Sequence, residues 1–272
     1  MYPKLYIEST KVVRVELSNI LQKYSKELKL EKYVKVIDVG CGPGNITNDL
    51  LHTYLHNTKS LIGIDNSAEM IRYAQEHYGK NPNLKFQILD ITTSHLPQAL
   101  RNEFDLVTSF YCIHVESDIK KIFENMYAML KPGGDLFVFI ADNCFPINIW
   151  KNLAQNSKWK QYMNNFQETT FSLQRSTNFV QLDTNLLKEI GFNVNSCTKQ
   201  EYQQSYDRKT FLDLMKSVHE FDIPKHLEND FILDHLDVLK SFNLINIDKD
   251  GQEQITILHD LIIVYANKSL ET

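Results

Sequence analysis

The first half of the chain alternates short apolar runs with amphipathic stretches. The runs are apolar on both faces, as in strands of a parallel sheet that helices cover on both sides. The stretches between them repeat apolar residues every three or four positions, which is typical of the covering helices. The strand-like runs span residues 34–40, 60–65, 84–90, 104–111 and 135–141. We therefore predict an α/β fold built on a mostly parallel sheet.

Capping residues predict where the helices between these strands begin and end. Asn45 can cap the first helix, and Asn66 followed by Glu69 resembles a capping box for the second. Ser117 is expected to open a third helix, which the stretch KPGG at 131–134 ends. The helix signals and the strand signals thus agree on one alternating order.

We interpret the whole chain, residues 1–272, as one domain, although the pattern changes after the fifth run. A short helix at 186–190 and strands at 192–204 and 255–266 are expected in the second half. The parts of the domain are an N-terminal helical lid (1–32, with a helix over about 10–30), a cofactor-binding core (33–141) and two insertions that roof a substrate pocket (142–182 and 205–250).

The composition favours a small-molecule partner. The 272 residues carry a formal net charge of −5, and the 29 basic residues are scattered along the chain. A surface that follows phosphates needs clustered positive charge, so we expect no nucleic-acid partner. The apolar runs are too short to span a bilayer and the N-terminus lacks the apolar core of a signal peptide, so we expect no membrane partner and a cytoplasmic protein. A homodimer stays open at this point.

The cysteines do not suggest a metal site. They form no CxxC pair and no His/Cys pattern with metal spacing, and they stand at positions 41, 112, 144 and 197. This argues against a disulfide framework and against a zinc site. We expect reduced thiols and no bound metal.

The stretch VIDVGCGPGN at 36–45 places three of the nine glycines of the chain within five residues. It follows the first predicted strand and precedes a predicted helix, so the backbone turns tightly and presents free N–H groups at a helix N-terminus. Such a turn is the outline of a nucleotide site, but tight turns at strand ends also use glycine for packing alone.

The spacing of the glycines distinguishes between nucleotides. A dinucleotide fingerprint that starts at Gly40 and Gly42 needs its third glycine at position 45, which is Asn45; here the third glycine is Gly44. Asp38 stands two residues before the first glycine. A carboxylate is unfavourable beneath a pyrophosphate and favourable beside an ammonium group. The loop therefore favours a nucleoside with a cationic tail.

Acidic residues end the next two strands at the same edge of the sheet. Asp65, followed by Asn66, is placed to accept hydrogen bonds from both ribose hydroxyls. Asp90 is placed to accept a hydrogen bond from an adenine amino group while Ile91 packs on the ring. Each acid alone can be read as a polar strand end or a helix cap. Acids at three successive strand ends point instead to a binding site.

Together these features resemble the class I S-adenosylmethionine-dependent methyltransferases. The matching elements are DVGCGPG at 38–44, Asp65, LDI at 89–91, LKPGG at 130–134 and the stretch 186–192. The resemblance implies a Rossmann-like, seven-stranded sheet in the order 3-2-1-4-5-7-6 with strand 7 antiparallel. It also implies S-adenosylmethionine as cofactor, S-adenosylhomocysteine as product, and cofactor contacts from Ser109 and Phe110.

More narrowly, the chain resembles the insect juvenile hormone acid O-methyltransferase family, which methylates the carboxylate of farnesoic or juvenile hormone acids. The shared pieces are LY at 5–6, SFYCIH at 109–114, KPGGD at 131–135, WxxLA at 150–154 and KWxxYM at 158–163. The resemblance implies substrate contacts from Tyr6, Tyr111, His114 and Trp150. Trp159 is better read as an ordinary core aromatic residue.

Two departures from the family pattern leave the methyl acceptor open. The family usually places Gln where this chain has Val13 and Trp where it has Val115, both in the substrate site. Valine offers no donor to a buried carboxylate, and each missing hydrogen bond costs about 1 to 3 kcal/mol. A carboxylate needs only positioning, whereas a phenol of pKa about 10 gains from a base. His114 can be that base, or it can merely order the loop or bind substrate.

The sequence thus predicts an O-methyltransferase that acts on a small lipophilic acid or phenol. Two functions of other classes remain as alternatives. One is an NAD-dependent oxidoreductase, which Asn45 disfavours. The other is a catalytically silent protein that binds S-adenosylmethionine.

Overall fold

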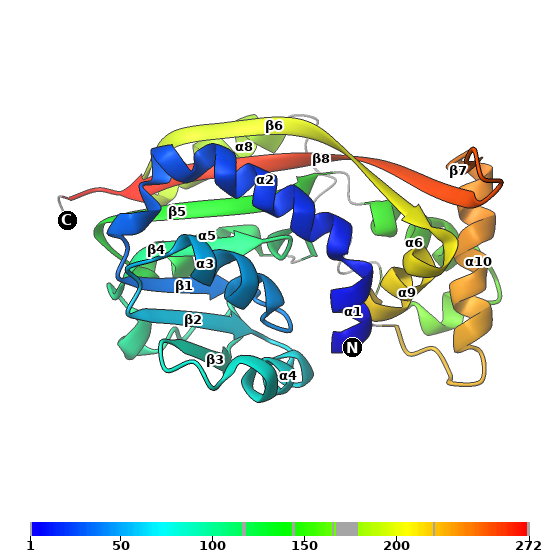
Figure 1. Ribbon diagram of the computed structural model, residues 1–272, viewed down its shortest axis with the longest axis horizontal. Helices are drawn as coiled ribbons and strands as arrows, with labels where there is room; N and C mark the ends of the chain where they lie inside the picture. The colour runs from blue at the N-terminus through cyan, green and yellow to red at the C-terminus, as the bar shows by residue number, and fades with distance from the viewer. Residues whose placement is uncertain are drawn as a thin grey trace.

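The computed structural model describes residues 2–115, 118–142, 145–164, 166, 179–219 and 221–270. Within these residues one sheet of eight strands runs through the molecule (Figure 1). The strands are β1 (Lys35–Val39), β2 (Ser60–Asp65), β3 (Leu84–Ile88), β4 (Phe104–Phe110), β5 (Leu130–Asp142), β6 (Phe192–Asp207), β7 (Ile245–Ile247) and β8 (Glu253–Lys268).

The order of the strands is β3-β2-β1-β4-β5-β8-β6, and β7 pairs with β8 at one end. Strands β1 to β5 pair in parallel, and β8 is antiparallel to both β5 and β6. The α/β fold and the predicted order, with its antiparallel strand, are therefore confirmed. The short strand β7 is an addition that the sequence pattern did not predict.

Helices cover both faces of the sheet, and each face has its own apolar core. On one face α2, the turn after β1 and α4 contribute residues such as Leu21, Leu51 and Ile71. On the other face α5 and α8 contribute Phe123 and Leu187. The helices are α1 (Pro3–Ser9), α2 (Lys11–Leu28), η1 (Leu30–Lys32), η2 (Thr47–Leu51), α3 (His52–Tyr54), α4 (Ala68–Tyr78), η3 (Gln98–Leu100), η4 (Ile113–Val115), α5 (Ile119–Met129), α6 (Phe145–Gln155), η5 (Lys160–Tyr162), α8 (Phe179–Ile190), α9 (Arg208–Val218) and α10 (Glu228–Ser241).

The remaining helices gather beyond the carboxyl ends of the parallel strands, where α6, α9 and α10 form a cap (Figure 1). A third apolar cluster holds this cap together, with Trp159, Phe211 and Phe231 fully buried in it. The strands β6 and β8 run from the sheet into the cap, and Ile255 and Ile257 of β8 belong to the cap cluster. The roof that 142–182 and 205–250 were predicted to form over a substrate stays a prediction.

Several predicted boundaries shift in the structure. The N-terminal helix expected over about 10–30 is α2, Lys11–Leu28, and the short helix α1, Pro3–Ser9, precedes it as an addition that was not predicted. Strand β5 begins at Leu130, which pairs with Phe104, but KPGG at 131–134 forms an irregularity before pairing resumes at Asp135; α5 ends at Met129, just before this stretch, as predicted. Strands β6 and β8 exceed the predicted ranges because their polar ends pair with each other, as in Tyr206 with Ile255.

The caps of three helices also differ from the prediction. Asn45 lies inside the first helix, whose next residues wind as the π-helix η2. Ser67, not Asn66, caps α4, because its hydroxyl accepts a hydrogen bond from the amide of Met70. Asp118 caps α5, and Ser117 lies outside the described residues.

Candidate active site

The glycine loop lies between β1 and the helix that starts at Asn45, at the carboxyl edge of the sheet. Gly40, Gly42 and Gly44 all have positive φ angles, of 73°, 53° and 81°. A Cβ atom on Gly44 would come within 2.7 Å of the Phe86 ring, whereas one on Gly42 would meet nothing within 4 Å. Gly44 is therefore required by packing, and Gly42 leaves its backbone open to a ligand.

Asp38 is buried beneath this loop, with 2% of its surface exposed. Its carboxylate accepts hydrogen bonds from the hydroxyls of Thr47, at 2.6 Å, and of Thr108, at 2.9 Å. Burial raises the pKa of Asp38 to about 6, and the two threonine hydrogen bonds oppose that rise. A nearby cation would stabilise such a buried carboxylate, which fits the ammonium of the predicted cofactor.

Asp65 ends β2 and supports the loop. Its carboxylate accepts hydrogen bonds from the amides of Gly42 and Ser67, both at 2.9 Å. Burial raises the pKa of Asp65 against the effect of these two amides. Asn66, beside it, is exposed. Asp65 thus has a structural role that the sequence did not reveal, and its predicted contact with ribose stays a prediction.

The predicted adenine site lies at the end of the next strand. Asp90 is exposed and accepts hydrogen bonds from the amide and the hydroxyl of Thr92, at 2.8 and 2.7 Å. Ile91 is buried in the core on the α5 side of the sheet. Leu96 and Leu100 belong to the same core. The predicted packing of Ile91 on adenine stays a prediction.

Two buried polar atoms near the loop have no hydrogen-bond partner among the described residues. They are Oδ1 of Asn45 and the hydroxyl of Ser109. Buried polar groups normally find a partner, so these atoms await one from a ligand. Together with the open backbone at Gly42 they fit a polar nucleoside. Phe110, in contrast, packs on Phe139 in the core, with ring centroids 4.8 Å apart.

The chain leaves β4 through Tyr111, whose φ of 53° is rare for a residue with a side chain. Its hydroxyl donates a short hydrogen bond to Glu16 of α2. Burial, followed by the charge of Glu16, raises the pKa of Tyr111 far above its ordinary value. Tyr111 is therefore a neutral donor whose proton is already committed to Glu16.

His114 lies one turn further on, in η4, and its ring is edge-on to that of Tyr111 with centroids 6.3 Å apart. It is 7% exposed, and its Nδ1 has no partner among the described residues. Burial, together with the nearby His259, lowers the pKa of His114 to about 4. The ring is consequently neutral at pH 7.

The other predicted substrate residues lie in different surroundings. Burial, and then the charge of Asp65, raises the pKa of Tyr6 to about 12. Val13 of α2 is partly buried and packs against the apolar core on that face of the sheet. Trp150 lies in the cap cluster and donates its indole N–H to His235 at 3.2 Å. The side chain of Val115 is outside the described part of the structure.

Trp159 is a core residue, as predicted. Its side chain is fully buried in the cap, and its indole N–H donates to Asp234 at 2.8 Å.

Sequence reasoning missed Glu16 and His259, which contact Tyr111, and Gln204, which contacts Glu16. Glu16 and His259 are 8% and 7% exposed. A buried glutamate on a lid helix was the available signal, because Glu16 falls on the same helical face as Leu17, Ile20 and Tyr24. His259 stands in a strand whose pairing with β6 was not visible from the sequence.

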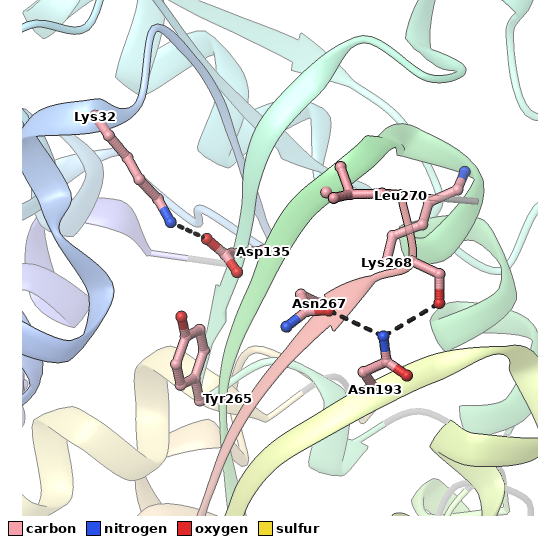
Figure 2. Close-up of a pocket in the computed structure, with 9 residues that line it drawn as sticks. Lys32, Asp135, Asn193, Tyr265, Asn267, Lys268 and Leu270 are labelled. Atoms are coloured by element: carbon pink, nitrogen blue, oxygen red, sulfur yellow. Dashed lines mark hydrogen bonds and ion pairs between the residues drawn. The ribbon is translucent and has the colours of Figure 1, made fainter. Parts of the chain in front are cut away.

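A polar hollow of about 540 Å³ lies at the opposite edge of the sheet (Figure 2). Lys32 pairs there with Asp135 at 2.7 Å, and Asn193 bonds to Asn267. Lys268 donates to three oxygen atoms of neighbouring residues, among them Asn102 at 2.7 Å. Since its cations have partners within the protein, this hollow is a structural feature of the sheet edge and not the cofactor site.

Among the described residues, no group of three or more His, Cys, Asp or Glu side chains is arranged to hold a metal ion. Across the same residues, no helix combines the length and the apolar character needed to cross a bilayer.

Comparisons with known proteins agree with this geometry. Residues 36–134 match the family model of a methyltransferase domain. The juvenile hormone acid O-methyltransferase of Drosophila melanogaster is 30% identical over 98% of this chain and 92% of its own length. The chain belongs to the juvenile hormone acid O-methyltransferase family of class I methyltransferases. The Bombyx mori member of this family is 26% identical over 97% of the chain and 96% of its own length.

Solved structures show the same fold as this family member. The YcgJ protein of Bacillus subtilis has a TM-score of 0.57 at 17% identity, with 92% of this chain and 98% of that one covered. A phosphoethanolamine N-methyltransferase of Haemonchus contortus, solved with S-adenosylmethionine, has a TM-score of 0.51 at 16% identity, with 96% and 57% covered. These structures show the fold, and the family match shows that the chain is an S-adenosylmethionine-dependent methyltransferase.

Proposed function

We propose that this methyltransferase transfers its methyl group to an oxygen atom of a small lipophilic acceptor. The observation that carries the proposal is the group of buried polar side chains around Tyr111, which follows β4 at the edge where the glycine loop also lies: Glu16, His114 and His259 are only 7% to 8% exposed. The relatives that match over nearly the whole chain are named as O-methyltransferases of an acid. S-adenosylmethionine would supply the methyl group as a sulfonium, and the residues that would hold it are Asp38, Gly42, Asp65 and Asp90.

Two acceptor groups are compatible with this site. A farnesoid carboxylate is supported by the family. A phenol is supported by the absence of a donor at Val13 and by the commitment of the Tyr111 proton to Glu16. A buried carboxylate without donors is poorly paired, which weakens the first case.

The test is a methyl-transfer assay with labelled S-adenosylmethionine on matched farnesoid acids and phenols. Calorimetry with S-adenosylhomocysteine and with NADH separates methyl transfer from the oxidoreductase alternative. Tight NADH binding without a response to S-adenosylhomocysteine contradicts the proposal. Binding of S-adenosylhomocysteine with no turnover of any acceptor supports a silent binding protein.

The double substitution V13Q and V115W probes the acceptor. It restores the two donors of the family pattern, so we expect faster turnover of the farnesoid acid and slower turnover of phenols. The singles, V13Q and V115W, show whether each donor acts alone. An unchanged preference of the double variant contradicts the reasoning from the missing donors.

A further inference from the structure

A buried cluster of polar side chains lies against Tyr111, and it contains a carboxylate from the lid helix. Glu16 of α2 accepts hydrogen bonds from the hydroxyl of Tyr111 and, at 3.1 Å, from the amide of Gln204 in β6. His259 of β8 adds its Nε2 at 3.3 Å from Glu16. The cluster therefore joins four elements: α2, β6, β8 and the segment after β4.

The hydrogen-bond pattern fixes which nitrogen of His259 carries the proton. Nε2 lies 3.3 Å from Glu16 Oε1 and 3.3 Å from the hydroxyl of Tyr111. Tyr111 gives its only proton to Glu16, so both atoms that face Nε2 are acceptors. Nε2 must therefore be the donor, and in the neutral ring Nδ1 carries the lone pair.

This lone pair has no partner. Nδ1 of His259 is buried and makes no hydrogen bond within the described residues. The ring of His259 stacks on that of Tyr202, with centroids 6.0 Å apart, and is tilted against that of Tyr111, with centroids 6.2 Å apart. A buried acceptor of this kind is satisfied by a ligand that brings an O–H proton. An ionised carboxylate brings no proton and adds a second negative charge near Glu16.

His114 and His259 flank the same tyrosine ring but are not equivalent. A carboxylate orients His259 and would stabilise its imidazolium, which is the usual arrangement of a histidine base. No carboxylate is hydrogen-bonded to His114 among the described residues, and its pKa of about 4 makes it a weak base toward a phenol. Between the two histidines, the geometry favours His259 as the proton acceptor.

We propose that His259, positioned by Glu16, accepts the proton of a phenolic hydroxyl, and that this pair makes the site select phenols over carboxylates. The inference rests on the proposed O-methyl transfer and names its acceptor. Because His259 is only 7% exposed, the proposal requires that the acceptor displaces a neighbouring side chain to reach Nδ1.

The proposed step balances as follows. The phenolic oxygen forms the new C–O bond to the methyl carbon that S-adenosylmethionine supplies, and the C–S bond breaks with its electron pair left on sulfur. The phenolic proton passes to Nδ1 of His259, which becomes an imidazolium beside Glu16. Glu16 is a positioning residue, since it acts only through His259.

The experiment compares wild-type protein with H259Q and E16Q on a matched phenol and farnesoid acid. Gln at 259 can still donate toward Glu16 but cannot accept a proton. We expect wild type to prefer the phenol, H259Q to lose about 100-fold or more in kcat on it, and E16Q to lose less. The acidic limb of the kcat/KM profile against pH should vanish in H259Q. The ionisable groups that face His259 are Glu16 from α2, Tyr111 and His114 from the segment after β4, and Tyr202 from β6.

A second readout needs no turnover. The probe is 4-nitrophenol, whose ionised form absorbs visible light; bound to wild type it should ionise at lower pH than in solution, and bound to H259Q it should not. H77Q, at an exposed histidine of α4, is the matched control and should behave as wild type in both assays. Thermal unfolding and S-adenosylhomocysteine binding verify that each variant is folded.

The outcomes separate the inference from the function on which it rests. Wild type that methylates farnesoid acids but not phenols overturns the inference and keeps the proposed function. Equal losses on acid and phenol in H259Q, or loss of the acidic limb in H114Q alone, also overturn it. Turnover of neither acceptor overturns the proposed function, and the 4-nitrophenol titration then decides the inference by itself.

Discussion

Replacing Asp38 by Asn should make the protein more stable while weakening cofactor binding. The folded protein holds the proton of Asp38 more tightly than the unfolded chain does, since its pKa rises from 3.8 to about 6. The contribution of Asp38 to stability is therefore fully present below pH 3.8, and it is lost as the pH rises to about 6. At 1.36 kcal/mol per pKa unit, this loss is about 3 kcal/mol at pH 7.

Asn removes the buried charge and so avoids this loss. It keeps one oxygen acceptor, so one of the threonine hydrogen bonds is weakened, at a cost of about 1 kcal/mol. The net expectation is a gain of about 2 kcal/mol at pH 7, or about 4 to 8 °C in Tm for a chain of this size. Affinity for S-adenosylmethionine should fall, because the carboxylate predicted to face its ammonium is gone.

The assay is urea unfolding of wild type and D38N between pH 4 and pH 8. The difference between the two proteins should be largest at pH 7 to 8 and should shrink toward pH 4. D105N is the control, and its effect on stability should have the opposite sign. Burial raises the pKa of Asp105, but hydrogen bonds from Lys131, Lys35 and Val34 outweigh burial and lower this pKa overall. D105N should lose stability at pH 7. A D38N protein less stable than wild type at pH 8 would refute the reasoning.

Three further substitutions, at Gly44, Gly42 and Trp159, test the loop and the cap. The free energy of unfolding of G44A should be about 1 to 3 kcal/mol lower than that of G42A, because only at Gly44 would the new Cβ meet Phe86 and Ala74 within 3 Å. Equal urea midpoints of the two variants would contradict this. G42A should instead lower the affinity for S-adenosylhomocysteine, as measured by calorimetry. W159A should cost about 3 to 5 kcal/mol in urea unfolding, since it empties a fully buried site in the cap and removes the hydrogen bond to Asp234; a change below 1 kcal/mol would mean that the cap is not packed around it.

The sheet could be predicted from the sequence because its strands are local apolar runs. The glycine loop could also be predicted, because positive φ angles favour glycine over other residues and the sequence places glycine at these positions. The far halves of β6 and β8 could not be predicted, because residues 199–207 are largely polar and become a strand only through their partner. Local sequence patterns thus predict the strands that are apolar along their length, but not the polar segments that form a strand only by pairing with a distant one.

The acceptor end of the site was harder to predict for the same reason. Tyr111 and His114 were identified through a local motif, and their rings lie 6.3 Å apart after β4, but their contacts with substrate stay a prediction. Glu16 and His259 are separated by 243 positions in the chain and meet only through the fold. Neither belongs to a spacing pattern, so the proton acceptor that we propose could emerge only from the three-dimensional arrangement.

The long strands β6 and β8 also determine how this protein can be recombined with its relatives. Residues of one continuous strand pair hold both the cofactor half and the cap, from Phe192 with Lys268 to Asp207 with Gln254. A chimera that takes the cap of another family member must therefore cross over in both strands at paired positions, for example at Lys199 and Ile262. Crossovers at unmatched positions would shift the register of the pair, and each shift by one residue would turn the cap-facing side chains toward solvent. The cap of this architecture is therefore exchanged as a paired block of two segments that are distant in the sequence.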